Sequence, residues 1–545
     1  ALTSGLASQR PRMDGHDDIE VRPLGATAAT MLAGALLARR SDAVGARIVT
    51  ESGGNPFFIH ELARYANEHP QWSTQVAGEA FDLERVVWSR VERLPPPARA
   101  MLELVAIAGQ PVRNRHWRDA IDGASVDPQT FALLRFEHLI RSTGPSPDDE
   151  VETYHDRIRE TVAARLEAPV RIGHHRRLAL SMESHGDADP ETVAVHFAEG
   201  GERERAGVHY AHAARGAERA LAFDRAAKLY ELALEHRPGD DAGRRDLLSA
   251  LGGALANAGR GRPAAEAYER AAGLADDATA RLDLQRKAAS QYCTSGHIDQ
   301  GRDLFADVMR GVGLRPTESS AVILIQLMGR RAALRLRGLR HTPRSEAQVP
   351  PELLRRLDTL WATSTALSNV DVVRVAALQS QALLLALRAG EPRRLALALA
   401  WEAVLNATAG TRAAPRSEHL LQVARGLLDQ DAPPHSRGMM SLSAGWVAFL
   451  HARFPDALAL CDEAEPVFRD QCTGVWWELT LTRTMIAWAL AHCGRTGELA
   501  ARIHTWEPEA RSRGDHFLVT NLLAFPMPFE RLLAGDLGAA EAHLR

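Results

Sequence analysis

The stretch L-A-F-D-R-A-A-K-L-Y-E-L-A-L-E-H-R-P, residues 221–238, decides the fold class of this chain. Its apolar residues recur every three to four positions, which predicts an amphipathic helix. Small side chains at fixed positions would let a second helix approach closely, while the tyrosine ring fills the groove between the two. The pattern predicts a repeat of two antiparallel helices. The residues at its key positions are Ala214, Ala226, Tyr230, Ala233 and Pro238.

The same pattern returns twice, and it resembles the tetratricopeptide repeat. The equivalent small residues Ala226, Ala264 and Gly301 are 38 and 37 residues apart, close to the period of about 34 residues in that family. Stacked repeats of this kind form a helical solenoid whose concave surface binds a partner. We therefore expect a protein or a ligand on that surface. The second copy is Gly252, Ala264, Tyr268 and Ala271; the third is Ala289, Gly301, Phe305 and Val308; weaker copies lie at 387–399, 451–464, 491–500 and 533–545.

The composition of the chain excludes several classes of function. The chain has 545 residues, with 25% charged residues and a formal net charge of −4, so no global basic field favours nucleic acid. The cysteines at 293, 461, 472 and 493 are scattered without a C-x-x-C motif, which fits the reducing cytoplasm and offers no metal framework. The longest apolar run, 321–328, is far shorter than the roughly 20 residues of a membrane span. We expect a cytoplasmic protein without a membrane span.

A second informative stretch is T-E-S-G-G-N-P-F-F-I-H-E-L-A-R-Y, residues 50–65. Gly53 and Gly54 permit backbone angles that other residues avoid. Asn55 can cap a helix, and Pro56 suits its first turn. On its own, the pattern describes the start of an amphipathic helix.

The run G-G-N-P-F-F-I-H-E-L resembles the G-N-P-F-F-x-x-E-L signature of STAND-class regulatory P-loop ATPases. The phrase V-R-P-L at 21–24 sits where that family leaves its nucleotide-binding sheet for a helical lid. The resemblance implies that Gly54, Asn55 and Pro56 lie against the adenine or ribose of a bound nucleotide. It also implies ATP or ADP with Mg as cofactor of the parent protein.

Residues 81–162 predict two helices broken at Pro95–Pro97, further helices, a turn at 144–149 and a last helix. This order suggests a winged helix, and R-L-P-P-P-A-R and H-D-R-I-R-E resemble the module that follows the lid in the STAND family. Three arginines, Arg113, Arg115 and Arg118, are either phosphate contacts or, as we favour, a solvated face. His174 and His175, followed by two arginines, are typical of a surface helix.

No P-loop is present. Neither Lys228 nor Lys287 lies in the G-x-x-x-x-G-K-[ST] context that cradles phosphates. We therefore expect the ATPase core upstream of Ala1, a chain that stops within a helix at Arg545, and no ATP bound by this part alone. The expected domains are 1–25, the end of the nucleotide-binding domain; 26–78, the lid; 79–168, the winged-helix-like module; 169–311, repeats; 312–350, a bridging Arg-rich helix and linker; and 351–545, further repeats.

The bridging segment carries arginines at 330, 331, 335, 337 and 340. They could form a membrane-surface or acidic-partner helix, but the solvated face of a bridging helix is the favoured interpretation. The order of segments through D-T-L-W at 358–361 and L-L-L-A-L-R-A-G-E-P at 383–392 resembles the sensor region of myxobacterial-type serine/threonine protein kinases. The resemblance implies the regulatory part of such a kinase. A large LuxR-type transcription regulator and a repeat-only scaffold are the alternatives.

Catalytic motifs are not expected in the chain. H-E-L-A-R at 60–64 lacks the second histidine of a zinc protease. Cys293 and His297 form a lone pair, which is more often packing than a metal site. Tyr154-His155-Asp156 resembles part of a triad without a nucleophile beside it. We predict neither catalytic nor metal-binding residues here.

Overall fold

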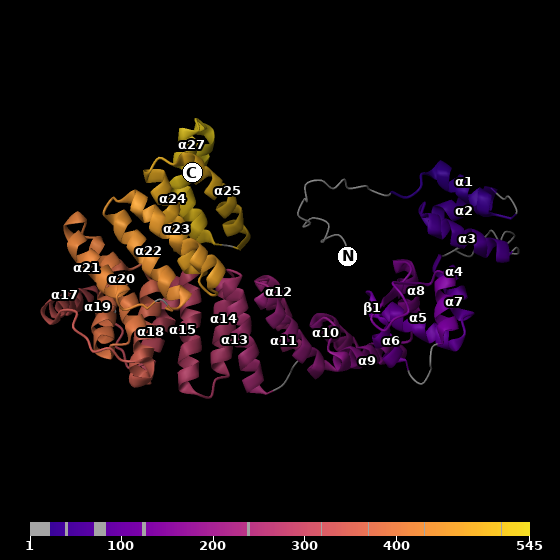
Figure 1. Cartoon of the computed structure of the whole chain (residues 1–545), viewed down its shortest axis with the longest axis horizontal. Helices are drawn as coiled ribbons and strands as arrows, with labels where there is room; N and C mark the ends of the chain where they lie inside the picture. Colours follow the sequence, from indigo (N-terminus) through magenta and orange to yellow (C-terminus); the bar gives the residue numbers. More distant parts are fainter. Residues whose placement is uncertain are drawn as a thin grey trace. The chain divides into compact units, whose positions relative to one another are not determined.

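The computed structural model describes residues 22–38, 42–69, 83–121, 127–236, 240–317, 319–368, 370–429, 431–513 and 515–544. The chain divides into two compact units, Ala1–Glu202 and Arg203–Arg545, and each is described by itself. Figure 1 shows that helices dominate both. The predicted mainly α class is confirmed, and the second unit is an α-solenoid. Most of the predicted end of the nucleotide-binding domain, residues 1–21, lies outside the described residues.

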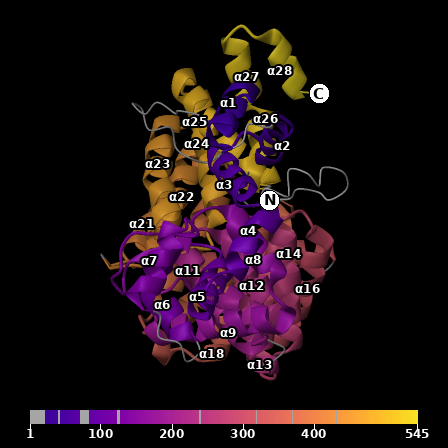
Figure 2. The ribbon, with the colours of Figure 1, turned by 90° about the vertical axis from the view of Figure 1, so that its right-hand side faces the viewer.

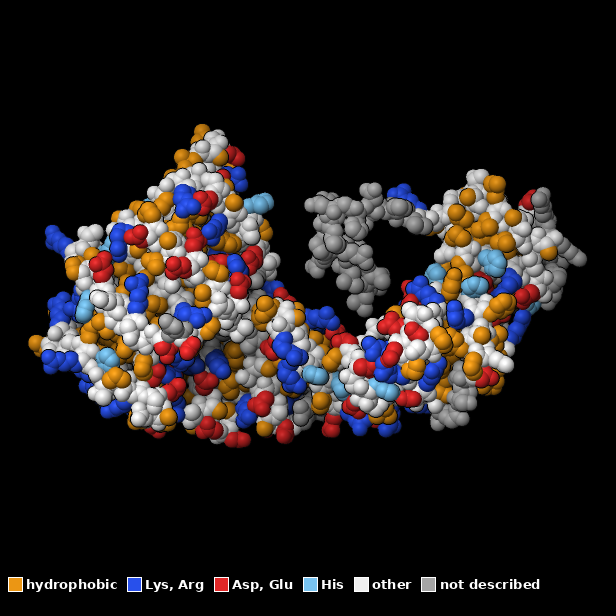
Figure 3. Space-filling view, viewed as in Figure 1, with side chains coloured by type: hydrophobic (Ala, Val, Ile, Leu, Met, Phe, Trp, Pro, Cys, Tyr) orange, Lys and Arg blue, Asp and Glu red, His pale blue; other side chains and the backbone are white. Residues whose placement is uncertain are grey.

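The first unit begins with three helices that all pack on one another: α1 (Ala26–Leu36), α2 (Asp42–Ser52) and α3 (Pro56–Glu68). Small residues make the closest contacts of α1, because Ala29 and Ala33 are fully buried. Leu32 and Leu36 of the same helix are only half-buried. Hydrophobic side chains gather on the surface over α1 and α2 (Figure 3).

A helical module with a small sheet follows. The sheet is antiparallel with strand order β1-β3-β2, and β3 pairs Val151 with both Val112 and Ser142. The turn predicted at 144–149 joins β2 to β3. The order helix, strand, two helices and hairpin is the order that a winged helix requires. The elements are α4 (Leu83–Glu92), α5 (Pro96–Ala108), β1 (Val112–Arg113), α6 (Asn114–Ala120), α7 (Pro128–Phe136), β2 (Ile140–Ser142), β3 (Glu150–Thr153) and α8 (Asp156–Arg165).

The unit closes with α9 (Ala168–His185) and α10 (Pro190–Glu199). These helices were expected to open the repeats at residue 169, but α9 packs on α5 and α6, and α10 packs on α9. The division therefore falls after Glu202. The repeat pattern at Ala214 and Ala226 begins only beyond this point, which is consistent with the later boundary.

The surface placement expected for His174 and His175 is wrong. Both side chains are buried in α9. His174 Nε2 lies 3.1 Å from Glu103 Oε2, and His175 Nδ1 lies 2.9 Å from His196 Nδ1 on α10. Burial, together with the neighbouring His175, lowers the pKa of His196 to about 3. Burial also lowers the pKa of His175, against the attraction of Glu199.

Because of this histidine pair, we predict that the folded chain loses stability in mild acid. The unfolded chain protonates His196 near pH 6.5 and the folded chain only near 3, so the unfolded state binds more protons as the pH falls between these values. We expect His196 to remove about 2 kcal/mol of stability between pH 7 and pH 5. Urea unfolding at both values should show a smaller pH effect in His196→Gln than in the parent chain. His60→Gln, at an exposed position of α3, is the control; equal pH effects in the two variants would contradict the assignment.

Paired helices build the second unit, and Figure 1 shows α13, α14 and α15 stacked side by side. The first three pairs are α11 (Arg203–Arg219) with α12 (Phe223–His236), α13 (Asp241–Asn257) with α14 (Gly261–Gly273), and α15 (Ala278–Thr294) with α16 (Ile298–Gly311). After α17 (Ser320–Arg337) come α18 (Pro351–Ala366), α19 (Val372–Ala389), α20 (Pro392–Ala407), α21 (Ala414–Arg425), α22 (Pro434–Leu450), α23 (Phe454–Gln471), α24 (Trp476–His492), α25 (Thr496–Arg513), α26 (His516–Ala524), α27 (Pro526–Leu533) and α28 (Leu537–Leu544).

The predicted small positions lie in the contacts between paired helices. A Cβ added to Gly252 would stand 2.9 Å from the Tyr268 ring, so the ring occupies the space that a side chain would need. A Cβ added to Gly301 would stand even closer, 2.4 Å from Cys293 Sγ on the facing helix. The short distance between the helices therefore requires a small residue at these repeat positions. The predicted position Pro238 lies outside the described residues. The repeat positions within the described residues that are fully buried include Ala214, Ala226, Ala233, Ala264, Ala271 and Ala289.

The solenoid winds back on itself. One small cavity is lined both by Asn257 and Gly259, at the turn between α13 and α14, and by Trp476 and Leu479 of α24. Figure 2 shows the winding from a second direction, with α14 and α16 on one side and α22 and α23 on the other. Helix α19 is the described helix with the length and hydropathy of a membrane span, yet it packs against α17, α18 and α20 within this unit.

The predicted bridging helix is α17, but its arginines do not form one solvated face. Arg330 donates to the Ala377 carbonyl at 3.0 Å and Arg337 to the Leu387 carbonyl at 3.2 Å, both on α19. Arg331 lies 3.7 Å from the buried Glu402 carboxylate of α20. Arg335, Arg337 and Arg340 are exposed, as the solvated interpretation expects, although Arg337 also binds α19. The helix packs on α19 as a layer added outside the regular pairing.

Candidate functional site

The loop between α2 and α3 has a fixed shape. Gly53 and Gly54 have φ of 55° and 78°, the left-handed region that favours glycine. Asn55 is the N-cap of α3, since its side chain accepts from the Phe57 amide at 3.0 Å, and Pro56 occupies the first turn. The predicted capped helix start is therefore present. Gly53 and Pro56 are exposed, whereas Gly54 is buried.

Gly54 is buried by the segment that leads into α1. The Leu24 amide donates to the Gly54 carbonyl at 2.9 Å. A Cβ on Gly54 would stand 2.4 Å from the Leu24 carbonyl oxygen and 3.3 Å from Pro23. The phrase V-R-P-L and the G-G-N-P loop, which the sequence separates by about 30 positions, are thus in direct backbone contact at their described residues.

A test of this contact compares two neighbouring glycines. Gly53→Ala meets nothing within 4 Å and carries only the strain of a positive φ, about 1–2 kcal/mol. Gly54→Ala carries the same strain and also displaces Leu24, so we expect a further loss of about 1–3 kcal/mol. Hydrogen exchange of the Leu24 amide should accelerate in Gly54→Ala and stay near the parent rate in Gly53→Ala. Equal rates in both variants would show that the close approach is unimportant.

The β3–α8 junction meets the same loop. Asn55 Nδ2 lies 3.4 Å from His155 Nε2, and the His155 ring packs on Phe58 with centroids 4.5 Å apart. Phe57 lies between Tyr154 and His155. Burial lowers the pKa of His155, although the Asp156 carboxylate opposes this effect. At neutral pH the ring is therefore neutral, and its Nδ1 accepts from the Arg157 amide at 3.2 Å as the cap of α8.

An arginine network fixes α3 to the sheet module below this junction. Arg90 of α4 pairs with the buried Glu61 of α3 and lies 2.9 Å from the Glu137 carboxylate after α7. Arg64 joins the same two carboxylates at 3.1 and 3.4 Å. Burial alone would raise the pKa of Glu137, but Arg90 and Arg64 hold it below its usual range. We call these four residues the lid clamp.

Sequence reasoning placed the loop but missed its partner. The structure places Asn55 of this loop beside His155, which had been weighed only as part of a triad. His155 instead caps α8 and contacts Phe58 of α3. The resemblance of H-D-R-I-R-E to the module after the lid was the available signal, but a contact across 100 residues leaves no local pattern.

The three arginines considered for phosphate contact are engaged within the unit. Arg113 pairs with Asp187, Arg115 pairs with Asp148, and Arg118 donates to the Pro145 carbonyl at 3.1 Å. Figure 3 shows acidic and basic side chains mixed over the face in view. These arginines are therefore not simply solvated, because carboxylates and the 144–149 turn bind their side chains.

No cluster of three or more metal-ligating side chains occurs among the residues that the structure describes. Cys293 is buried beside Phe305, and burial raises its pKa to about 12. His297 lies instead 3.3 Å from Ser295. The Cys293–His297 pair is therefore part of the packing of α15 and the turn that follows it.

Comparison with known proteins finds no related sequence and a weak similarity to solved structures. No protein-family model matches the chain, and no curated protein matches it. Among solved structures, the chain is similar to a signal transduction ATPase with numerous domains (STAND) with a tetratricopeptide repeat sensor from Pyrococcus horikoshii. The sequences are 10% identical, the match covers 96% of this chain and 71% of that chain, and the TM-score is 0.38.

Proposed function

We propose that this chain is the regulatory and sensor region of an ATP-dependent signalling switch of the STAND class. Residues 26–78 act as the lid, residues 79–168 as a winged-helix module that gates the ATPase, and the repeats as the receiver of a protein or ligand signal. The observation that carries the proposal is the meeting of Pro23–Leu24, the Gly53–Pro56 loop and His155 at one place. Exposed backbone at Gly53 and the rigid Pro56 ring suit the flat face of a nucleotide base.

The lid has the features of a part that docks on a further domain. Apolar residues of α1 remain exposed, with Met31 72% accessible, and Leu32 and Leu36 are half-buried. An ATPase core that precedes Ala1 would supply the P-loop and Mg, and it would cover this face. Nucleotide would then favour the closed arrangement, and a signal on the repeats would shift the balance by binding one state more tightly.

The output domain in this proposal is a serine/threonine kinase of the parent protein, in the cytoplasm. The four cysteines are free thiols, which is consistent with a reducing compartment. A LuxR-type regulator would carry a DNA-binding helix-turn-helix in place of the kinase. A scaffold would carry neither a kinase nor a P-loop.

Photolabelling of the full-length protein tests the nucleotide contact. With 8-azido-ATP and Mg, we expect the labelled peptide to contain Asn55 and Pro56, and excess ATP to prevent the labelling. Labelling confined to peptides outside 50–65 would contradict the role of this loop. Labelling that excess ATP leaves unchanged would also contradict it.

A further inference from the structure

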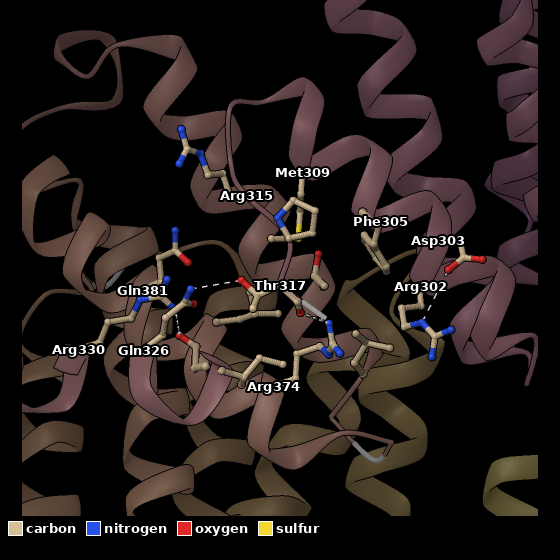
Figure 4. Close-up of a pocket in the computed structure, with 17 residues that line it drawn as sticks. Arg302, Asp303, Phe305, Met309, Arg315, Thr317, Gln326, Arg330, Arg374 and Gln381 are labelled. Atoms are coloured by element: carbon tan, nitrogen blue, oxygen red, sulfur yellow. Dashed lines mark hydrogen bonds and ion pairs between the residues drawn. The ribbon is translucent and has the colours of Figure 1, made fainter. Parts of the chain in front are cut away.

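A cavity of about 340 Å³ lies inside the second unit, where the added helix α17 interrupts the regular pairing. Its walls come from α16, the connection to α17, α17 itself, α18 and α19 (Figure 4). Because α17 packs on α19 and does not pair with α16, side chains of the connection line a hollow that a regular repeat would fill. Ligand pockets usually begin at about 300 Å³, so the cavity has room for a small molecule.

Hydrogen bonds fix the position of the segment that connects α16 to α17. Arg356 donates to the Val312 carbonyl at 2.8 Å, and Arg374 donates to the Thr317 carbonyl at 2.8 Å. Gln326 of α17 reaches the Thr317 hydroxyl at 3.3 Å. These bonds tie the connection to α17, α18 and α19, so the cavity is formed before any ligand enters.

The cavity combines an apolar floor with an excess of positive charge. Phe305, Met309, Ile323 and Leu367 are buried in its wall. Four arginines line it, against the single carboxylate of Asp303. Figure 4 shows these arginines spread around the cavity, with Arg374 near its centre. Such a lining suits a molecule with an apolar body and an anionic group.

Two of the four arginines are already neutralised. Arg302 lies 3.1 Å from Asp299, and Arg374 lies 2.9 Å from Asp371. The other two have no carboxylate partner among the described residues. These are Arg315, which is exposed at the cavity, and Arg330, which is half-buried on α17 and bonds only to the Ala377 carbonyl.

Arg330 is the residue that most directly indicates an anionic ligand. Burial lowers its pKa, with no carboxylate to oppose the effect. Leaving a cation partly desolvated is unfavourable unless an anion compensates it. A guanidinium also binds carboxylate or phosphate oxygens through two parallel hydrogen bonds. An anion placed beside Arg330 would therefore supply the compensation that this chain does not.

We propose that the cavity between α16, α17, α18 and α19 binds a small amphiphilic anion, its carboxylate or phosphate held by Arg330 and Arg315 and its apolar body on Phe305, Met309 and Leu367. The proposal that this cavity binds a ligand depends only on the geometry described above. The proposal that this ligand is the signal of the switch rests on the proposed function. Because α17 joins the early repeats to α19, a ligand here would fix the relative position of α16 and α19.

Calorimetric titration of the chain with octanoate, octyl phosphate, inorganic phosphate and 1-octanol tests the site. We expect one saturable site for octanoate or octyl phosphate, with 1-octanol weaker by at least about tenfold, because a charged hydrogen bond contributes at least about 1.4 kcal/mol. The stronger of the two anions identifies the headgroup, and weak binding of inorganic phosphate shows that the apolar body matters. Equal binding of 1-octanol and octanoate would overturn the proposal, as would tighter binding of inorganic phosphate than of either amphiphile.

Variants on one helix provide the matched control. Arg330→Gln should weaken binding at least about tenfold, whereas Arg335→Gln, an exposed arginine of the same helix, should leave it within about twofold. Arg315→Gln alters no packing, so it remains informative if Arg330→Gln fails to fold, and it should also weaken binding. Unchanged binding in both cavity variants would overturn the site. These titrations need no nucleotide, so their success with a failed 8-azido-ATP labelling would reject the switch and keep the site.

Discussion

Replacing Arg90 with methionine should release the lid from the sheet module. The substitution keeps an unbranched side chain but leaves Glu61, which is 4% exposed, with Arg64 as its remaining arginine partner. Removing one partner of a buried ion pair costs about 3–5 kcal/mol, because the remaining charge stays desolvated. Urea unfolding of the chain should show this loss in the transition of the first unit. Hydrogen exchange should accelerate along α3.

The control for Arg90 stands three residues further along. Arg93 pairs with Glu68, and both side chains are about half exposed. Surface pairs of this kind contribute about 0–1 kcal/mol, so Arg93→Met should be nearly neutral. If the two variants lose equal stability, the lid clamp does not hold the lid. If Arg90→Met destabilises the first unit but hydrogen exchange in α3 is no faster than in the remainder of that unit, Arg90 contributes only to general packing.

Gly301→Leu should separate α15 from α16. A Cβ at this position would lie 2.4 Å from Cys293 Sγ and 2.8 Å from the Ala289 carbonyl oxygen, so a leucine displaces backbone as well as a thiol. Overpacking of a close contact usually costs about 1–3 kcal/mol and sometimes more; we expect the upper end here. The measurement is the denaturant midpoint of the second unit.

Gly216→Leu is the matched control on α11. Nothing lies within 4 Å of a Cβ at Gly216, and leucine has a higher helix propensity than glycine by nearly 1 kcal/mol. This variant should be neutral or slightly stabilising. A similar loss in both variants would mean that Gly301 is not a contact position of a helical repeat.

The sequence predicted the parts of the fold that depend on local patterns. Proline positions marked the break at Pro95–Pro97, which separates α4 from α5 in the structure. The repeat positions were found because each requires a small or aromatic residue at a fixed spacing. Gly301 and Phe305 illustrate this, since one faces Cys293 and the other is buried in the same cluster.

Contacts between distant segments account for what the sequence did not predict. The arginines of α17 read as a solvated face, because nothing local reveals that Ala377 and Glu402 lie opposite. His174 and His175 read as surface residues, because their partners Glu103 and His196 belong to other helices. In the candidate site, Asn55 was predicted from its motif, whereas its neighbour His155 needed the fold. The cavity at Arg330 likewise exists only through the placement of α17.

The sequence of the coding DNA upstream of the Ala1 codon tests the central claim most directly. If the chain is the lid and sensor region of a nucleotide switch, the reading frame continues upstream and encodes a G-x-x-x-x-G-K-[ST] segment. Kinase motifs before that segment would support the kinase output, and their absence would favour the transcription regulator. A reading frame that starts near Ala1, or one that extends upstream without a P-loop, would contradict the nucleotide role of Gly54, Asn55 and Pro56.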